Sequence, residues 1–557
     1  MSKQVRTIII AIVAVVALSG VLAVLLLLPQ MTGGQTDTSS AASTASNSSI
    51  TLHNKLLGED GKAVDTPVKN AEILLDKEAE KEADDTSSAA ESSGEESQSG
   101  EDAPAERIAE ELTFILAEGG DLVVEKYKDL PVNTSKASAL KSNLATITAT
   151  KKIEIAQQNA ADFGFDRPQA KVSVTYHDDS TYAFEIGDRA PLDAGYYFRE
   201  EGSSDIYLVS ISFGEAMLQE GKDYVSLSMY TKPSLNEGAD SDTVCVQEMG
   251  LSGQVRQDHP FKLRQQTNED PDYVMSSYVM LEPFFMRQID DNQITTLTTN
   301  MTSLTAKSIV SVYPTEEEKA QYGFNDPYSV ADLRIAVRQA ETTSDSSDTS
   351  DSSQSEEETP TVYYNIRNHV VTLGSKDADG NYYAMITSDG EEMPVIYLVS
   401  ASAVPWAETQ YGDILGTLLF LRNITNINDI VVSWGDTSYT FNLEHFPDAE
   451  ESADKLKVTV DGVVYDTENF RQLYQIMMSV KRNGEVEDEP TGTPDMTIEI
   501  HPNDGSGEIV ANFYKYNANN YICELNDGDR YLVTAAAVSN TMKQVENYLA
   551  GKTIVAN

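Results

Sequence analysis

Six histidines are the residues of this chain best suited to bind a transition metal, because a neutral imidazole is a preferred zinc ligand. None lies three or four residues from another, the spacing at which a helix presents two ligands side by side: His53, His177, His259, His369, His445 and His501. The two cysteines, Cys245 and Cys523, fit either one long-range bridge or two buried thiols. The sequence therefore predicts no metal site and no cofactor.

Residues 377–381 resemble the beginning of a calcium-binding loop, in which oxygen ligands alternate along the chain. The sixth position is Tyr382, where the sharp turn of such a loop requires glycine. The twelfth position is Ser388, where a bidentate glutamate would complete the ligand shell. We interpret the segment as a hairpin turn.

Ser138 and Lys141 have the Ser-x-x-Lys spacing at which a helix brings a lysine close to a serine nucleophile. The companion motifs of that enzyme class are missing, because isoleucine follows the Gly-Lys-Thr sequence at 551–553 and no Ser-Asp-Asn occurs. We predict no catalytic residue. The alternative is a glycan-acting enzyme with two carboxylates in a cleft, which a sequence alone cannot reveal.

The chain is strongly acidic. Its 557 residues include 40 Lys and Arg and 89 Asp and Glu, which gives a formal charge of −49 and opposes binding to nucleic acid. Part of this charge lies in two serine-rich tracts, 78–106 and 341–359. Both tracts lack the apolar residues that offset the entropy cost of ordering, so we predict that they are disordered insertions.

The beginning of the chain contains an uncharged apolar run, 7–28. At about 1.5 Å per residue, a helix of this length crosses a hydrocarbon layer of about 30 Å, so we predict a single transmembrane helix. Lys3 and Arg6 place residues 1–6 in the cytoplasm and the C-terminal bulk outside the cell membrane. A Ser/Thr-rich stalk, 29–50, follows the helix. A signal peptide cleaved near residues 32–34 is the alternative.

Two short sequences recur along the chain. Ile-Tyr-Leu-Val-Ser at 206–210 returns at 396–400, and a variant, Arg-Tyr-Leu-Val-Thr, occupies 530–534. Phe-Gly-Phe-Asp-Arg-Pro at 163–168 returns as Tyr-Gly-Phe-Asn-Asp-Pro at 322–327, where the glycine suits a positive φ in a turn that leads into a strand. Internal similarity of this kind indicates duplication. We predict three repeat units, at 51–235, 236–422 and 423–557.

Each unit is expected to contain an antiparallel β-meander, because apolar and polar residues alternate along it. The strands expected in the first unit are 171–176, 181–186, 196–199 and 206–209. Helices are expected beside the meanders, at 135–148, 212–219, 401–410, 467–480 and 535–549. The predicted fold class is α+β, with one N-terminal transmembrane helix followed by three tandem repeats of a β-meander flanked by helices.

Tyrosines recur in the last strands of the meanders. Successive side chains of a strand point to opposite faces, so one tyrosine of each adjacent pair faces the core and the other faces solvent. We consider four of them as contacts for a protein partner or a glycan, with core packing as the alternative: Tyr196, Tyr207, Tyr382 and Tyr397. In the closing strand, we expect Ile206 and Leu208 to pack on the helices and Tyr207 to face outward.

The first unit resembles a bacterial family. The residues that carry the resemblance are 163–168, Ile186-Gly187-Asp188 followed by Ala190-Pro191, Tyr196-Tyr197 and 206–209. They resemble the domain of unknown function 4340 family over 110–225, more faintly over 285–405, and in the last repeat mainly at Tyr531-Leu532-Val533. The resemblance implies membrane-anchored, extracytoplasmic bacterial proteins that lack an established activity and are often encoded beside ABC-type permeases and gliding-type auxiliary proteins.

The predicted function is a binding or assembly module without catalytic activity, held at the cell envelope by its own N-terminal helix. The resemblance implies an ABC-type permease or an envelope protein as its partner, and no nucleic acid is expected. The alternative is an extracellular enzyme that acts on glycans or the cell wall through a carboxylate site between repeats. The sequence leaves the oligomeric state open.

Overall fold

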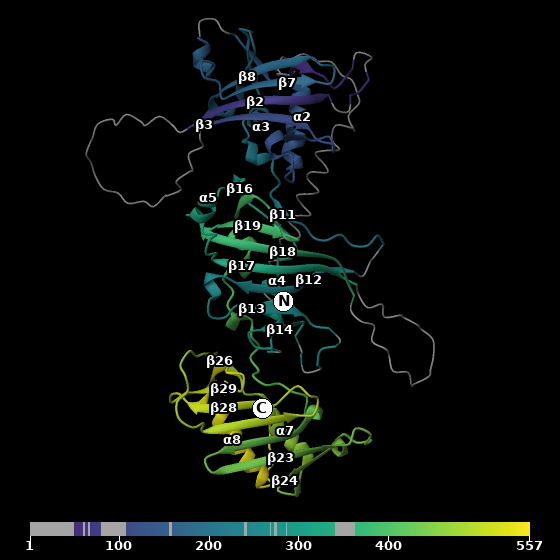
Figure 1. Ribbon diagram of the computed structural model, residues 1–557, viewed down its shortest axis with the longest axis vertical. Coiled ribbons are helices and arrows are strands. Elements are labelled where there is room, and N and C mark those ends of the chain that lie inside the picture. The colour runs from purple at the N-terminus through teal and green to yellow at the C-terminus, as the bar shows by residue number, and fades with distance from the viewer. Residues whose placement is uncertain are drawn as a thin grey trace, which may run out of the picture.

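The computed structural model describes residues 49–556, with gaps at 59–61, 65–66, 79–106, 155–158, 239–241, 268, 272–273, 275, 286 and 340–361. The described chain forms three large antiparallel sheets that follow one another along the long axis (Figure 1). Strands account for 44% of the described residues and helices for 21%. The predicted α+β class is therefore wrong, because β-sheet dominates the part of the chain that the structure describes.

The first sheet has eight strands. In spatial order they are β4 (Leu122–Val124), β3 (Arg107–Leu116), β2 (Val68–Glu78), β7 (Ala170–Tyr176), β8 (Thr181–Arg189), β9 (Tyr196–Glu200), β10 (Ile206–Val209) and β6 (Lys151–Ile153). The four strands expected from the sequence correspond to β7, β8, β9 and β10. They form half of the sheet, and the sequence interpretation assigned no strands to the other half.

The second sheet repeats this order. Its strands are β14 (Tyr278–Glu282), β13 (Phe261–Gln265), β12 (Thr243–Ser252), β17 (Ser329–Arg338), β18 (Tyr363–Lys376), β19 (Tyr382–Ser388), β21 (Val395–Val399) and β16 (Ser308–Val312), with β20 (Glu391–Glu392) paired to β19. The third sheet has an additional edge strand: β25 (Val463–Tyr465), β24 (Leu456–Val460), β23 (Thr437–His445), β22 (Ile427–Trp434), β27 (Met496–Pro502), β28 (Ile509–Lys515), β29 (Asn520–Leu525), β30 (Arg530–Thr534) and β26 (Arg482–Glu485).

The two acidic tracts connect paired strands. Glu78 at the end of β2 lies opposite Arg107 at the start of β3, and Arg338 of β17 lies opposite Tyr363 of β18. Both tracts are therefore insertions between the strands of a hairpin, where added length costs little free energy. Glu78 ends β2, so the structure contradicts the predicted disorder at that residue, and the other residues of the two tracts lie outside the described part of the chain.

Helices pack beside the sheets. They are α2 (Thr134–Ala145), α3 (Ile211–Met217), α4 (Asp291–Thr298), α5 (Glu316–Gln321), α6 (Tyr411–Ile414), α7 (Thr467–Met478) and α8 (Ala535–Leu549). α8 begins where the Thr534 side chain accepts a hydrogen bond from the Ala537 amide, and it buries residues at helical spacing, Val538, Thr541, Val545 and Tyr548. Two short 3-10 helices, η7 (Ala401–Ala403) and η8 (Pro405–Glu408), replace the expected helix at 401–410. Pro405 explains the break, because proline cannot donate a backbone hydrogen bond.

The first sheet has a core of its own, whereas the second and third sheets share one continuous core. β11 (Ser228–Tyr230) pairs with β15 (Leu304–Thr305), just as β1 (Ile50–Asn54) pairs with β5 (Thr146–Ala149). Residues 228–230 therefore pack with the second unit, although they precede the boundary expected after 235. Cys245 and Cys523 are both free thiols.

The closing strands face the opposite way from our expectation. Tyr397 and Val399 belong to the shared core, and Val209 belongs to the core of the first sheet with Tyr207 packed against it. Ile206 instead lies in a small cluster on the other side, with Phe163 and Phe165. The expected packing of the Ile/Leu face on the helices is therefore wrong, because the recurring Gly-Phe segment covers that face.

The expected transmembrane helix, 7–28, lies outside the described residues, as do the cytoplasmic start and nearly all of the stalk. Within the described ranges, no helix is both long enough and apolar enough to cross a membrane. The single-pass anchor and the extracellular location derived from it are therefore not supported.

Candidate functional site

The four tyrosines considered from the sequence as partner contacts do not form one site. Tyr196 and Tyr207 lie in the first sheet, and Tyr382 and Tyr397 lie in the second. Tyr196 is 7% exposed, and Tyr382 and Tyr397 are each 1% exposed. Tyr207 is half-buried beneath the Lys152 ammonium, 5.6 Å from its ring centre. Three of the four rings therefore offer little surface to a partner.

The hydroxyl group of Tyr382 has a structural partner. Its hydroxyl donates a hydrogen bond to Glu408 Oε1 at 2.9 Å, and Lys376 forms an ion pair with the same carboxylate. Burial, together with Glu408, raises the pKa of Tyr382 to about 12. The hydroxyl therefore stays protonated and joins β19 to η8, which is a structural role.

A cleft lies between the second and third sheets, with a volume of about 810 Å³. We call it the acidic cleft. Its lining combines carboxylates and aromatic rings from both sheets: Asp258, His259, Phe284, Tyr411, Glu485, Val486, Glu487, Asp488, Tyr516, Gly528, Asp529, Arg530, Tyr531 and Leu532. Five of these residues are acidic, whereas Arg530 is the one arginine or lysine in the lining. The cleft therefore attracts positive charge.

Asp529 forms the buried floor of the acidic cleft. Its Oδ2 accepts hydrogen bonds from the hydroxyls of Tyr411, at 3.0 Å, and Tyr531. Burial raises the pKa of both tyrosines well above the usual value, and the Asp529 charge raises it further. Both hydroxyls therefore remain protonated and donate to the carboxylate.

Two arginines join the second and third sheets around this floor. Arg287 lies with Nε 3.0 Å from Asp529 Oδ2, and its Nη2 donates to Asp527 Oδ2 at 2.6 Å. Burial acts to lower the pKa of Arg287, but Tyr531 and the two carboxylates raise it above its usual value. Arg482 of β26 donates to the carbonyl oxygen of Gly412 in α6 at 2.7 Å. Arg287 and Arg482 therefore hold together the parts of the second and third sheets that form the walls of the cleft.

The rim of the acidic cleft is more accessible. Tyr516 is 44% exposed, and its hydroxyl donates to Asp488 Oδ2 at 2.6 Å. Arg530, the one arginine of the lining, donates to Glu524 Oε1 at 2.9 Å. The rim can therefore offer free carboxylate oxygens and an aromatic ring to a cationic group, by charge attraction and by cation–π contact.

The sequence suggested a carboxylate site between repeats only as an alternative, and it identified none of the residues of the cleft. Its residues lie between positions 258 and 532, and neither their spacing nor their types form a motif. The run of acidic residues at 485–489 was the one available signal, but such a run on a strand end is typical of a solvated surface.

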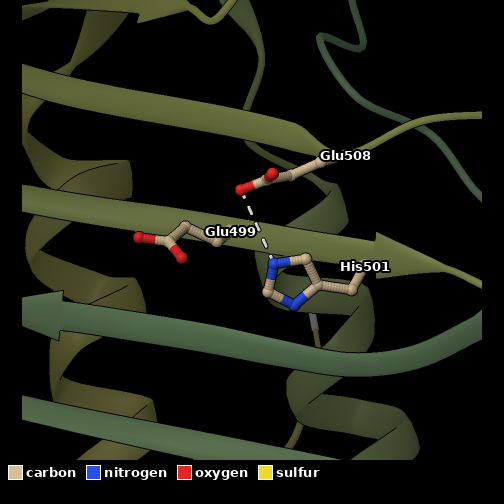
Figure 2. A group of neighbouring side chains, drawn as sticks. All are labelled: Glu499, His501 and Glu508. Atoms are coloured by element: carbon tan, nitrogen blue, oxygen red, sulfur yellow. Dashed lines mark ion pairs between the residues drawn. The ribbon is translucent and has the colours of Figure 1, made fainter.

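The residues that could hold a metal ion lie elsewhere in the third sheet. Glu499, His501 and Glu508 place ligand atoms within 4.8 Å of one another (Figure 2). Two other histidines are stacked on tyrosines instead: His53 on Tyr182, and His369 on Tyr230.

The chain has no significant match among curated proteins or among solved structures. A family model does match residues 123–269, from β4 through the beginning of the second sheet. Its description is "Domain of unknown function (DUF4340)". The match over this segment supports the DUF4340 family, which the sequence motifs indicated.

Proposed function

We propose that this protein is a binding or assembly module without catalytic activity, and that the acidic cleft is its binding site. The observation that carries the proposal is the lining, in which five acidic side chains lie with aromatic rings against one arginine. The ligand class that fits is a basic segment of a partner protein. The partner that the family resemblance implies is an ABC-type permease or an envelope protein.

The chemistry of the cleft floor favours binding over catalysis. A general acid must carry a proton, and a nucleophilic carboxylate must be free to attack. The Asp529 carboxylate instead receives two tyrosine hydroxyls and the Arg287 guanidinium. These contacts occupy its Oδ2 atom, so Asp529 supports the shape of the cleft.

The test is the affinity of the full chain for a lysine-rich peptide at 0.15 M salt, measured by fluorescence anisotropy. Glu487→Lys with Asp488→Lys reverses two charges at the cleft and is expected to weaken binding at least tenfold. Glu450→Lys with Glu451→Lys makes the same change of net charge on an exposed segment elsewhere, and it should change affinity little. Equal losses in both variants would refute the cleft as the site.

A glycan-acting enzyme is the second candidate, because carboxylates and tyrosines do meet between two sheets. It requires a carboxylate pair that acts as acid and as nucleophile or base. Release of reducing ends from cell-wall glycan would support it if Glu485→Gln, Glu487→Gln or Asp488→Gln abolished the release. No release by the wild-type chain would exclude it.

A further inference from the structure

The third sheet carries a group of three potential metal ligands outside the acidic cleft. Glu499 and His501 are two residues apart on β27, so their side chains lie on the same face of the strand. Glu508 immediately precedes β28, which pairs with β27. The neighbouring residues Ile498 and Ile500 point into the core and are fully buried, so the three polar side chains lie on the opposite, accessible face.

The three side chains lie next to one another on one face of the sheet, and the Glu508 carboxylate points toward the His501 imidazole (Figure 2). One ligand atom from each of Glu499, His501 and Glu508 lies within 4.8 Å of the others. His501 Nε2 is 3.5 Å from Glu508 Oε1. Glu499 and His501 are partly buried and Glu508 is exposed, so an ion can reach the group from solvent.

A fourth residue orients the histidine. Asp429 lies opposite His501 on the neighbouring strand β22, and its Oδ1 is 2.6 Å from His501 Nδ1. A carboxylate at this distance fixes a proton on Nδ1 and leaves the Nε2 lone pair directed away from Asp429. A carboxylate behind a histidine is the usual outer-shell partner of a metal-binding imidazole.

This arrangement brings acceptors together. With its proton on Nδ1, His501 presents a lone pair at Nε2 toward the carboxylates of Glu499 and Glu508, which can only accept. A second proton on the imidazole or a metal ion between the three acceptors would offset their mutual repulsion. An imidazole nitrogen with two carboxylate oxygens matches the ligands of Zn²⁺, and three protein ligands leave a fourth position for water.

We propose that Glu499, His501 and Glu508 bind one divalent transition-metal ion, of which Zn²⁺ fits best, with Asp429 as the residue that positions the imidazole. The inference does not depend on the acidic cleft, because none of these four residues lines it. Imidazole ligation favours Zn²⁺ over Ca²⁺, which prefers oxygen ligands. The ion would tie β27 to the beginning of β28.

The experiment is a calorimetric titration of the full chain with Zn²⁺ at 0.15 M salt, where weak binding to the many surface carboxylates is screened. We expect one high-affinity site in the wild type. His501→Gln should abolish it, Glu499→Gln and Glu508→Gln should each weaken it at least tenfold, and Asp429→Asn should weaken it by about 10- to 100-fold. Glu391→Gln removes the same charge from an exposed position of β20, and His177→Gln removes an exposed histidine, so both should bind as the wild type does.

A second readout keeps the test independent of folding defects. Zn²⁺ should raise the Tm of the wild type, because a ligand that binds only the folded state stabilises it. The rise should be absent in His501→Gln. At the same Zn²⁺ concentration it should be smaller in the exposed Glu508→Gln, which serves as the test if His501→Gln does not fold. Equal Zn²⁺ binding by the wild type and these variants would overturn the proposal in favour of a simple ion pair, as would tighter binding of Ca²⁺ than of Zn²⁺.

Discussion

The imidazole of His53 stacks on the ring of Tyr182, with ring centroids 4.2 Å apart and 18° between the planes. In the second unit the partners are exchanged: the ring of Tyr230 stacks on His369 at 4.4 Å and 24°. The positions are equivalent in the two units. His53 on β1 and Tyr230 on β11 lie on the strand that comes directly before the large sheet in the chain, and that strand pairs with β5 or β15. Tyr182 and His369 lie on β8 and β18, each of which is the fifth strand across its sheet. The same contact is therefore made twice with its two residues reversed.

These stacked histidines predict a loss of stability in mild acid. Burial lowers the pKa of both His53 and His369 below the usual value. Near pH 6.5 the histidines of the unfolded chain therefore take up protons, whereas those of the folded chain do not. The free energy of unfolding falls as the pH drops below about 6.5, and it stops falling once the pH is below the lowered pKa of the folded histidines. Denaturation at pH 7 and pH 5 should show a smaller loss for His369→Phe, which keeps a stacked ring, than for the wild type. The exposed His177→Gln is the control, and an equal loss in all three proteins would contradict the prediction.

At two glycines, any side chain is predicted to lower the stability of the fold. A Cβ at Gly187 would lie 2.2 Å from the carbonyl oxygen of Phe163, and one at Gly374 would lie 2.0 Å from that of Tyr322. Backbone atoms cannot yield as a flexible side chain can, so Gly187→Ala and Gly374→Ala should each lower the free energy of unfolding by about 1–3 kcal/mol. Gly119 has no atom within 4 Å of its Cβ position, so Gly119→Ala is the matched control in thermal melts. A loss at Gly119 as large as at the other two would refute the steric explanation.

The buried ion pair beneath the acidic cleft should be strongly coupled. Arg287→Met leaves Asp529 without its cation, and Asp529→Asn removes one carboxylate that faces the buried Arg287. Breaking one partner of a buried pair costs about 3–5 kcal/mol, whereas the double variant should cost less than the sum. The exposed pair Lys457–Glu444 should contribute under about 1 kcal/mol in the same double-mutant cycle. Additive losses at Arg287 and Asp529 would show that the two side chains act independently.

The orientation of the closing strand can be tested in the second unit. Tyr397 is fully buried in the shared core and Leu398 is only partly buried. Tyr397→Ala should therefore cost about 3–5 kcal/mol, the range for a buried aromatic ring, and Leu398→Ala clearly less. Urea denaturation of both variants measures the difference. A larger loss for the leucine variant would restore the face that the sequence suggested.

Local patterns predicted part of each sheet. Alternation identified the hairpin of β7 and β8, and the recurring glycines do adopt positive φ, 81° at Gly164 and 85° at Gly323. β2 was missed although Ile73 and Leu75 are buried, because its open face carries charged residues and the strand ends at the acidic tract. A strand with one charged face is difficult to distinguish from a solvated segment by composition.

The candidate sites were harder to predict for different reasons. The acidic cleft needs residues as distant as Asp258 and Asp529, which only the packing of two sheets brings together. The metal ligands did have a local signal, because Glu499 and His501 alternate on one strand and Glu508 follows the next turn. We considered histidines only at helical spacing, and a single histidine with two glutamates in a hairpin escapes that criterion.

The most direct test of the acidic cleft as a binding site is photo-crosslinking from its rim in the cells that make the protein. A photoreactive amino acid at Tyr516, at the rim, should form a covalent adduct with a partner protein, and the linked peptide should be rich in Lys and Arg. The same group at Val463, which is 57% exposed on the edge strand β25, is the control and should not form this adduct. No protein adduct at position 516, or identical adducts at both positions, would contradict the account.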